Sequence, residues 1–172
     1  MRSKLLIVCV LCLLAGCAGR GPQRPSQRKS QTPEADTSAL ALLALNQKMA
    51  EAADDQLMQI VKTQEEHYAL YEGNAWIHII SFGDKETESP KANEEWSMQM
   101  RVYDLNGRLL EDADRTFRIM RHELPYAVDL NIDILHHGAK AKMYAPWYSA
   151  FGVQGTEHVA PYENVIIEIE VR

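Results

Sequence analysis

The spacing of the apolar residues changes near residue 74, and this change constrains the fold more than any other feature of the sequence. Between residues 37 and 69 the apolar residues recur every three or four positions, which is the period of one face of an α-helix. From residue 75 onward they alternate with polar residues, which is the period of half-buried strands. The sequence therefore predicts a helical stalk over 37–69, followed by a domain of strands over 70–172.

The predicted stalk carries one apolar stripe. Good helix formers dominate the segment, and Asp36 or Ser38 can cap its start, while Asp54-Asp55 leaves open a break into two helices. The stripe needs an apolar partner, either the body of the same chain or a second copy in a homodimer through residues 40–61. Its members are Leu42, Leu45, Met49, Ala53, Leu57 and Ile60.

In the second part of the chain, the pattern predicts antiparallel strands around one short helix, which makes an α+β domain. Asn106-Gly107 is a favoured pair for a tight hairpin turn, because both positions tolerate positive φ. Pro125 suits a first helical turn, and Gly138 is a natural stop after that helix. The expected strands are 75–82, 96–103, 108–111, 116–120, 139–145 and 165–171, with a long loop over 146–163.

The first sixteen residues have the layout of an export signal. Arg2 and Lys4 precede an apolar run that ends in Leu14-Ala15-Gly16-Cys17. This ending looks like a bacterial lipobox, which implies cleavage before Cys17, diacylglycerol on its sulfur and acylation of the new amino group. Residues 17–36 are mostly polar and predict a flexible tether. We expect a lipid-anchored protein of the cell envelope, held in the outer membrane and facing the periplasm.

The composition argues against several other classes of protein. The chain has 18 basic and 24 acidic side chains, and a net charge of −6 does not suit a generally basic nucleic-acid-binding protein. The three cysteines lie at 9, 12 and 17, so a mature chain lipidated at Cys17 has no free thiol for catalysis or for a metal. His136-His137 are adjacent at a helix end and point apart. The sequence predicts no cofactor and no metal.

The C-terminal residues resemble a known family. Leu135-His136-His137-Gly138 ends the short helix, and the strand that follows leads to Pro146. An aromatic-glycine pair (Phe151-Gly152), a proline-containing turn (Val159-Ala160-Pro161) and a last strand with alternating acidic residues complete the pattern. In order and spacing these features resemble FKBP-type peptidyl-prolyl cis-trans isomerases, and the resemblance covers about residues 70–172. The resemblance implies an FKBP-like sheet wrapped on one short helix. Because a lipobox precedes this domain, the chain is also similar to envelope lipoproteins of the family, such as gliding-motility-associated isomerases.

The resemblance also implies a substrate pocket. By position, the pocket residues of the family correspond to Met100, Leu110, Glu111, Phe117, Leu124, Pro125, Val128, Phe151, Val159 and Ile167. Five of these depart from the family pattern. Met100, Leu110 and Glu111 stand where the family has a tyrosine, a phenylalanine and an aspartate. Val128 replaces the tryptophan that floors the proline pocket, and Phe151 replaces a tyrosine whose hydroxyl binds the substrate carbonyl. Simpler interpretations stay open. Phe117, Val128 and Ile167 suit the core of any such sheet, Phe151 suits packing of its loop, and Glu111 suits a solvated carboxylate at a strand end.

Prolyl isomerisation explains why no catalytic triad is visible in the sequence. The reaction rotates an amide over a barrier of about 18–20 kcal/mol without breaking a bond, so it needs no nucleophile, metal or general base. The resemblance implies an isomerase that assists the folding of exported proteins, with proline-containing polypeptides or envelope proteins as partners. The altered pocket keeps a second hypothesis open, a catalytically degenerate binding or scaffold lipoprotein.

Overall fold

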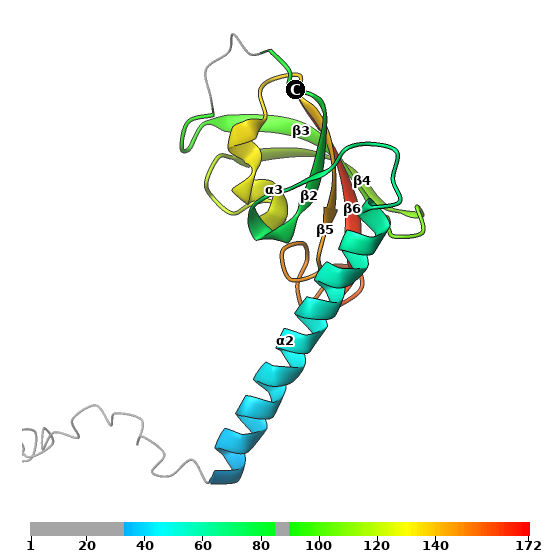
Figure 1. Ribbon diagram of the computed structural model, residues 1–172. Coiled ribbons are helices and arrows are strands. Elements are labelled where there is room, and N and C mark those ends of the chain that lie inside the picture. Colours follow the sequence, from blue (N-terminus) through cyan, green and yellow to red (C-terminus); the bar gives the residue numbers. More distant parts are fainter. Residues whose placement is uncertain (1–32, 85–89) are drawn as a thin grey trace, which may run out of the picture. The chain divides into compact units, whose positions relative to one another are not determined.

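The computed structural model describes residues 33–84 and 90–172 (Figure 1). The predicted signal peptide, Cys17 and the tether up to residue 32 lie outside the described residues. Residues 42–172 form one compact unit. The elements are α2 (Pro33–Val61), β1 (Ala69–Leu70), the 3-10 turn η2 (Glu72–Asn74), β2 (Trp76–Ser81), β3 (Glu95–Asp104), β4 (Leu109–Arg118), α3 (Tyr126–Leu130), the 3-10 turn η3 (Ile132–Ile134), β5 (Lys140–Ala145) and β6 (Val165–Val171).

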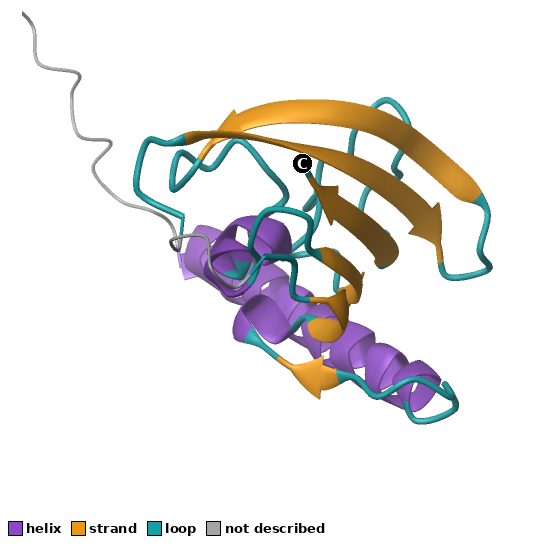
Figure 2. Cartoon of the chain, turned by 90° about the horizontal axis from the view of Figure 1, so that it is seen from above, coloured by secondary structure: helices purple, strands orange, loops and turns teal. Residues whose placement is uncertain are grey.

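One antiparallel sheet organises the domain. Its six strands follow the order β1-β2-β5-β6-β3-β4, and the sheet is curved rather than flat (Figure 2). The face that packs with α3 is called the inner face. Along β6 the inner-facing Val165, Ile167, Ile169 and Val171 are buried and join the main core, as their alternation predicts. The predicted α+β fold, an antiparallel sheet around one short helix, is confirmed.

The β3–β4 hairpin differs from its prediction. Instead of two short strands at 108–111 and 116–120, β4 is one strand that pairs with β3 from Glu95↔Arg118 to Tyr103↔Leu109. Apolar and polar residues do not alternate regularly inside β4, so the sequence pattern does not indicate that residues 109–118 form one continuous strand. The turn between the strands runs from residue 105 to residue 108, whereas the sequence predicts the two-residue pair Asn106-Gly107. The Asp104 carboxylate holds this turn by accepting the N–H groups of Asn106 and Arg108, both at 2.9 Å.

The helix α3 is shorter than its prediction. It ends at Leu130, where the Asn131 side-chain amide donates to the Ala127 carbonyl at 2.7 Å and occupies the acceptor that an α-helical N–H would use. The Asn131 N–H instead donates to Val128 at 3.1 Å, and the chain continues into η3. The predicted apolar face survives this break, because Val128 and Ile132 are both buried.

The helix α2 begins earlier and ends earlier than the predicted stalk over 37–69. It starts at Pro33 and passes through Asp54-Asp55 without a break. It ends at Val61, where the Thr63 hydroxyl and the Gln64 amide both donate to the Ile60 carbonyl, at 2.7 and 3.2 Å. Both side chains thus satisfy one of the last carbonyls of the helix, beyond which the chain turns away toward β1.

The apolar stripe of α2 divides into two halves. In its C-terminal half, Leu57 and Val61 pack on Tyr144 and Ile166, which lie on the outer face of the sheet, and form a second core with Tyr68. In its N-terminal half, the predicted stripe residues Leu42 and Leu45 are 62% and 52% exposed. Among residues 33–84 and 90–172, the body of the chain therefore covers only the C-terminal half of the stripe. Within the described residues, no helix has the combination of length and apolarity that a bilayer span requires.

Candidate functional site

The inner face of the sheet gathers most of the predicted pocket residues. Eight of the ten belong to one buried apolar cluster or pack against it. The other two, Glu111 and Pro125, directly follow cluster residues in the sequence. The cluster draws on β3, β4, β6, the segment before α3, α3 itself and the β5–β6 loop. Its predicted members are Met100, Leu110, Phe117, Leu124, Val128, Phe151, Val159 and Ile167.

Strand pairing explains the central part of the cluster. Met100 on β3 lies opposite Ile169 of β6, and its neighbour on the same face, Val102, lies opposite Ile167. Residues that pair directly across strands share a face of the sheet, so these four side chains form an apolar layer beneath α3. Val128 of α3 closes this layer from above and is fully buried.

The loop between β5 and β6 brings Val159 into the cluster by a tight turn. The Val159 carbonyl accepts the Thr156 N–H at 2.8 Å, and the Thr156 hydroxyl accepts the Val159 N–H at 3.0 Å. Gly155 precedes this turn with φ of +64°, and a Cβ there would lie 2.3 Å from the Val159 carbonyl oxygen. Glycine is therefore required for the approach that buries Val159.

A β-bulge places Leu110 and Glu111 on the same side of β4. Tyr103 pairs with Leu109 and Val102 pairs with Glu111, so Leu110 is an extra residue with no partner on β3. In a regular strand, Leu110 and Glu111 would point to opposite faces. Because of the bulge, Leu110 packs against the inner cluster and Glu111 shares the face of Val102.

Glu111 is not the solvated carboxylate that one interpretation of the sequence predicts. Its side chain is only 12% exposed and forms an ion pair with the Arg115 guanidinium. The two residues lie on the inner face of β4, on either side of Ala113, which pairs with Met100. Sequence reasoning missed Arg115, although its spacing of four from Glu111 across an inward-facing alanine is a signal that could have found it.

The floor of the site is closed to solvent. Val128 and Ile167 are each 0% exposed, whereas the rim residues Leu110, Pro125 and Phe151 are partly exposed. A prolyl ring therefore reaches the floor only if the rim moves. The rim is also poor in side-chain donors, because the Phe151 ring carries no hydroxyl and Pro125 carries neither a side-chain donor nor a backbone N–H.

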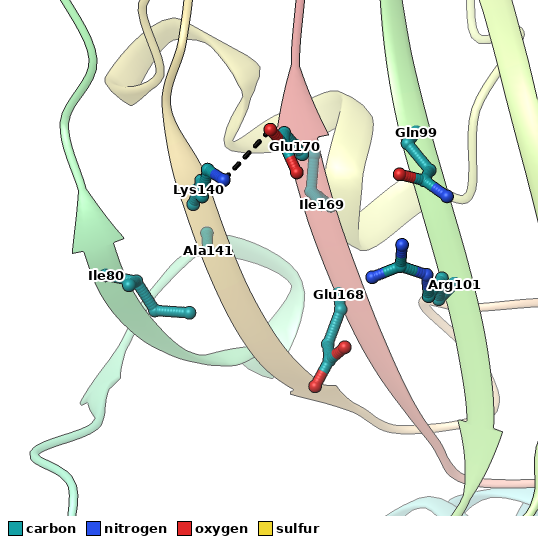
Figure 3. Close-up of a pocket in the computed structure, with 8 residues that line it drawn as sticks. All are labelled: Ile80, Gln99, Arg101, Lys140, Ala141, Glu168, Ile169 and Glu170. Atoms are coloured by element: carbon teal, nitrogen blue, oxygen red, sulfur yellow. Dashed lines mark ion pairs between the residues drawn. The ribbon is translucent and has the colours of Figure 1, made fainter.

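A groove of about 230 Å³ lies on the outer face of the sheet and is a different feature from this site (Figure 3). Polar side chains of the groove already have partners: Lys140 pairs with Glu170 at 2.9 Å, and Glu168 accepts the hydroxyl of Tyr103, which lies outside the groove, at 3.1 Å. Lys140 lowers the pKa of Glu170, while burial and the bond to Glu168 raise the pKa of Tyr103. The groove therefore offers an ion-paired surface, and the apolar site is the inner cluster.

Comparison with known proteins agrees with this geometry at the level of the fold. No family model matches the sequence, and no curated protein matches it. Among solved structures, the chain is similar to a peptidyl-prolyl cis-trans isomerase from Pseudomonas syringae pv. tomato, with a TM-score of 0.59 and 16% identity over 73% of this chain and 92% of the other.

Two further structures extend the comparison. FkpA from Escherichia coli gives a TM-score of 0.58 and 16% identity, covering 98% of this chain and 80% of its own. The N-terminal domain of FKBP42 from Arabidopsis thaliana gives 0.53 and 18% identity, covering 63% and 92%. At these identities the likeness establishes the fold, so the chain has the fold of FKBP-type isomerases, as the resemblance implies.

Proposed function

We propose that this chain, which has the fold of the FKBP-type isomerases, is a lipid-anchored peptidyl-prolyl cis-trans isomerase that assists the folding of exported proteins. The observation that carries the proposal is the convergence of eight predicted pocket residues on one inner cluster. They come from segments as distant in sequence as Met100 and Ile167, and they meet in the part of the fold where the resemblance places the pocket.

The chemistry of the site suits a twisted prolyl amide. A planar amide is stabilised by resonance and charge separation, and the rotating amide loses both. An apolar surface therefore favours the twisted form over the planar form, and this difference in binding is what lowers the barrier. Leu110 and Phe151 on the rim and Val128 on the floor provide such a surface, and no titratable group is needed at the reacting bond.

The closed floor favours a second candidate, a binding or scaffold lipoprotein of the envelope without isomerase activity. Val128 and Ile167 are inaccessible to a ligand unless the rim opens. The side chains of the rim residues Phe151 and Pro125 also lack donors that would orient a substrate. In this candidate the fold is retained for binding an envelope protein through exposed surfaces, and the inner cluster serves only as a core.

An isomerisation assay separates the two candidates. The purified full chain is added at micromolar concentration to a Leu-Pro or Phe-Pro peptide, and the isomerase predicts a rate that rises in proportion to protein. Leu110→Ala should lower this rate because Leu110 packs on the inner cluster, whereas Leu109→Ala, at an exposed neighbouring position, is the matched control. A rate equal to that in buffer would establish the scaffold candidate instead.

We also propose that Cys17 anchors the chain in the outer membrane, with the domain facing the periplasm. The lipobox-like Leu14-Ala15-Gly16-Cys17 supports this proposal. Several acyl chains give firm attachment, since each buried CH₂ contributes about 0.8 kcal/mol. Cys17→Ala should move the protein from the membrane fraction to the soluble fraction, and an unchanged membrane fraction would contradict lipidation.

A homodimer is proposed only through the uncovered part of α2. Within the predicted dimer segment 40–61, Ala53, Leu57 and Val61 are buried against their own domain. These three residues are therefore not available to a second copy. The exposed leucines of the N-terminal half, which are Leu40, Leu42, Leu43 and Leu45, support self-association of two copies. Sedimentation of the purified chain tests this, with Leu42→Ser as the disrupting variant and a concentration-independent monomer as the contrary result.

A further inference from the structure

The turn that carries Phe151 is attached to the helix α2 by a three-residue network outside the inner cluster. The Tyr148 hydroxyl donates to Asp54 Oδ1 of α2 at 2.5 Å. The Asn74 side-chain amide of η2 donates to the Tyr148 hydroxyl oxygen at 2.8 Å and to Asp54 Oδ2 at 3.1 Å. Three segments that are distant in sequence are therefore joined through a single phenolic oxygen.

The turn around Tyr148 is compact enough to transmit its position to Phe151. The Ala150 N–H donates to the Pro146 carbonyl at 3.0 Å, and the Gly152 N–H donates to the Trp147 carbonyl at 2.7 Å. These bonds close the chain on both sides of Tyr148, with Phe151 three residues further along. A displacement of the Tyr148 ring therefore displaces the rim residue as well.

The same turn also contacts the start of α3. The Ser149 carbonyl accepts the N–H of Ala127 at 2.6 Å, directly before the floor residue Val128. On its other side, a Cβ on Gly73 of η2 would lie 3.4 Å from the Ser149 Cβ, so η2 and the turn are in close contact. The position of the turn thus bears on both the rim and the floor of the site.

The Tyr148 hydroxyl remains a donor under all physiological conditions. Burial of the ring, followed by the bond to Asp54, raises the pKa of Tyr148 to about 12. A hydrogen bond to an ionised acceptor is about twice as strong as a neutral one, so the Tyr148–Asp54 contact is the strong member of the network. Asp54 is half-buried in the α2 face that docks on the domain.

We propose that Tyr148 and Asp54 are positioning residues for the prolyl-peptide site: through them the docked helix α2 holds the Pro146–Gly152 turn and fixes Phe151 at the rim. This inference rests on the proposed isomerase function of the inner cluster. Neither residue contacts the cluster itself, so their effect reaches the site through the backbone of the turn. α2 thereby contributes to substrate binding without reaching the site.

The test compares Tyr148→Phe with Tyr162→Phe in the purified full chain. Tyr162 belongs to the same aromatic group, with its ring 4.8 Å from that of Trp147, and its replacement removes a hydroxyl that does not bind α2. Tyr148→Phe should raise KM for a Leu-Pro peptide by about tenfold and change kcat little, because one charge-assisted hydrogen bond that holds the rim is lost. Tyr162→Phe should leave both constants unchanged.

Variants of Asp54 test the partner in the same assay. Asp54→Ala should match Tyr148→Phe, and the double variant should add little to either, because the two groups act as one unit. Asp54→Asn keeps an acceptor oxygen and should recover part of the loss. A KM for Tyr148→Phe that is unchanged or lower than that of the natural chain would overturn the proposal, since the network then does not support a productive rim.

Hydrogen exchange keeps this test separate from the proposed function. In Tyr148→Phe the amides of Gly152 and Ala127 should exchange faster by about tenfold, and in Tyr162→Phe they should not. If the natural chain shows no isomerase activity, the proposed function fails while this result still decides whether α2 holds the turn. Unchanged exchange at both amides would overturn the positioning role in either case.

Discussion

Replacing Leu57 by alanine tests whether the docking of α2 is part of the domain's stability. Leu57 is 0% exposed and packs in the second core with Val61, Tyr68, Tyr144 and Ile166. Its truncation removes apolar contact and leaves a cavity, and such changes cost about 2–5 kcal/mol. We expect a loss near the middle of that range, about 3 kcal/mol, because the site lies between a helix and a sheet and can close only in part.

Denaturant unfolding, followed by circular dichroism and by tryptophan fluorescence, measures this loss. A domain of this size loses about 2–4 °C of melting temperature per kcal/mol, so Leu57→Ala should melt about 6–12 °C lower. Gln59→Ala is the control, since Gln59 lies on the same helix two residues away and is exposed, and surface changes of this kind stay within about 0.5 kcal/mol.

Two results would refute this reasoning. Equal effects of Leu57→Ala and Gln59→Ala would mean that the second core contributes nothing to stability. Separate transitions in the natural chain, with helix lost before fluorescence changes, would mean that α2 melts independently of the sheet. In that case Leu57→Ala would shift only the first transition.

Three further predictions concern the rim, a turn and the response to acid. Phe151→Tyr adds a donor at the rim and should raise kcat/KM by up to about tenfold without changing the melting temperature, and a lower kcat/KM would contradict the assigned role. Gly155→Ala should destabilise the domain by more than about 2 kcal/mol, because its Cβ would lie 2.3 Å from the Val159 carbonyl oxygen. Gly107→Ala is the control: Gly107 has a φ of +82°, and a Cβ there would have no atom within 4 Å, so this variant measures the cost of positive φ alone. The N–H of Arg108 lowers the pKa of Asp104, so this carboxylate stabilises the folded chain above its ordinary pKa and the contribution is lost as the pH falls through the lowered value. Unfolding midpoints measured between about pH 6 and pH 2 should therefore fall less steeply in Asp104→Asn, and an identical slope would show that the turn does not depend on the ionised form.

The strongly periodic elements could be predicted from the sequence. The alternation of Val165, Ile167 and Ile169 with acidic residues predicts β6 and its inner face, and both are confirmed. The long stripe of α2 predicts a helix, although the side chains of Thr63 and Gln64 end it at Val61. Local hydrogen bonds of this kind decide helix ends, and a hydrophobic period does not record them.

The irregular parts of the site could not be predicted in the same way. The bulge at Leu110 depends on the register between β3 and β4, which no local pattern in either strand specifies. Arg115 is a charged residue on the otherwise apolar inner face, and its ion pair with Glu111 makes this position tolerable. No apolar period in the sequence indicates such a pair. The bond between Tyr148 and Asp54 joins residues that are 94 positions apart, and only the folded chain brings them together.

The sequence shows the substitutions at the site, and the structure shows how the site residues are buried. Val128 is fully buried and belongs to the same cluster as Met100, Phe117 and Ile167. The sequence identified the change of residue type, but only the structure shows that the floor is closed to solvent. This closure is why activity must be measured directly.

The central proposal is that the inner cluster catalyses prolyl isomerisation. Exchange NMR on a Leu-Pro peptide measures the cis–trans rate directly, with and without a small fraction of the purified full chain. The account predicts a rate that rises linearly with added protein and that falls in Leu110→Ala but not in Leu109→Ala. A rate that is the same with and without protein would contradict it.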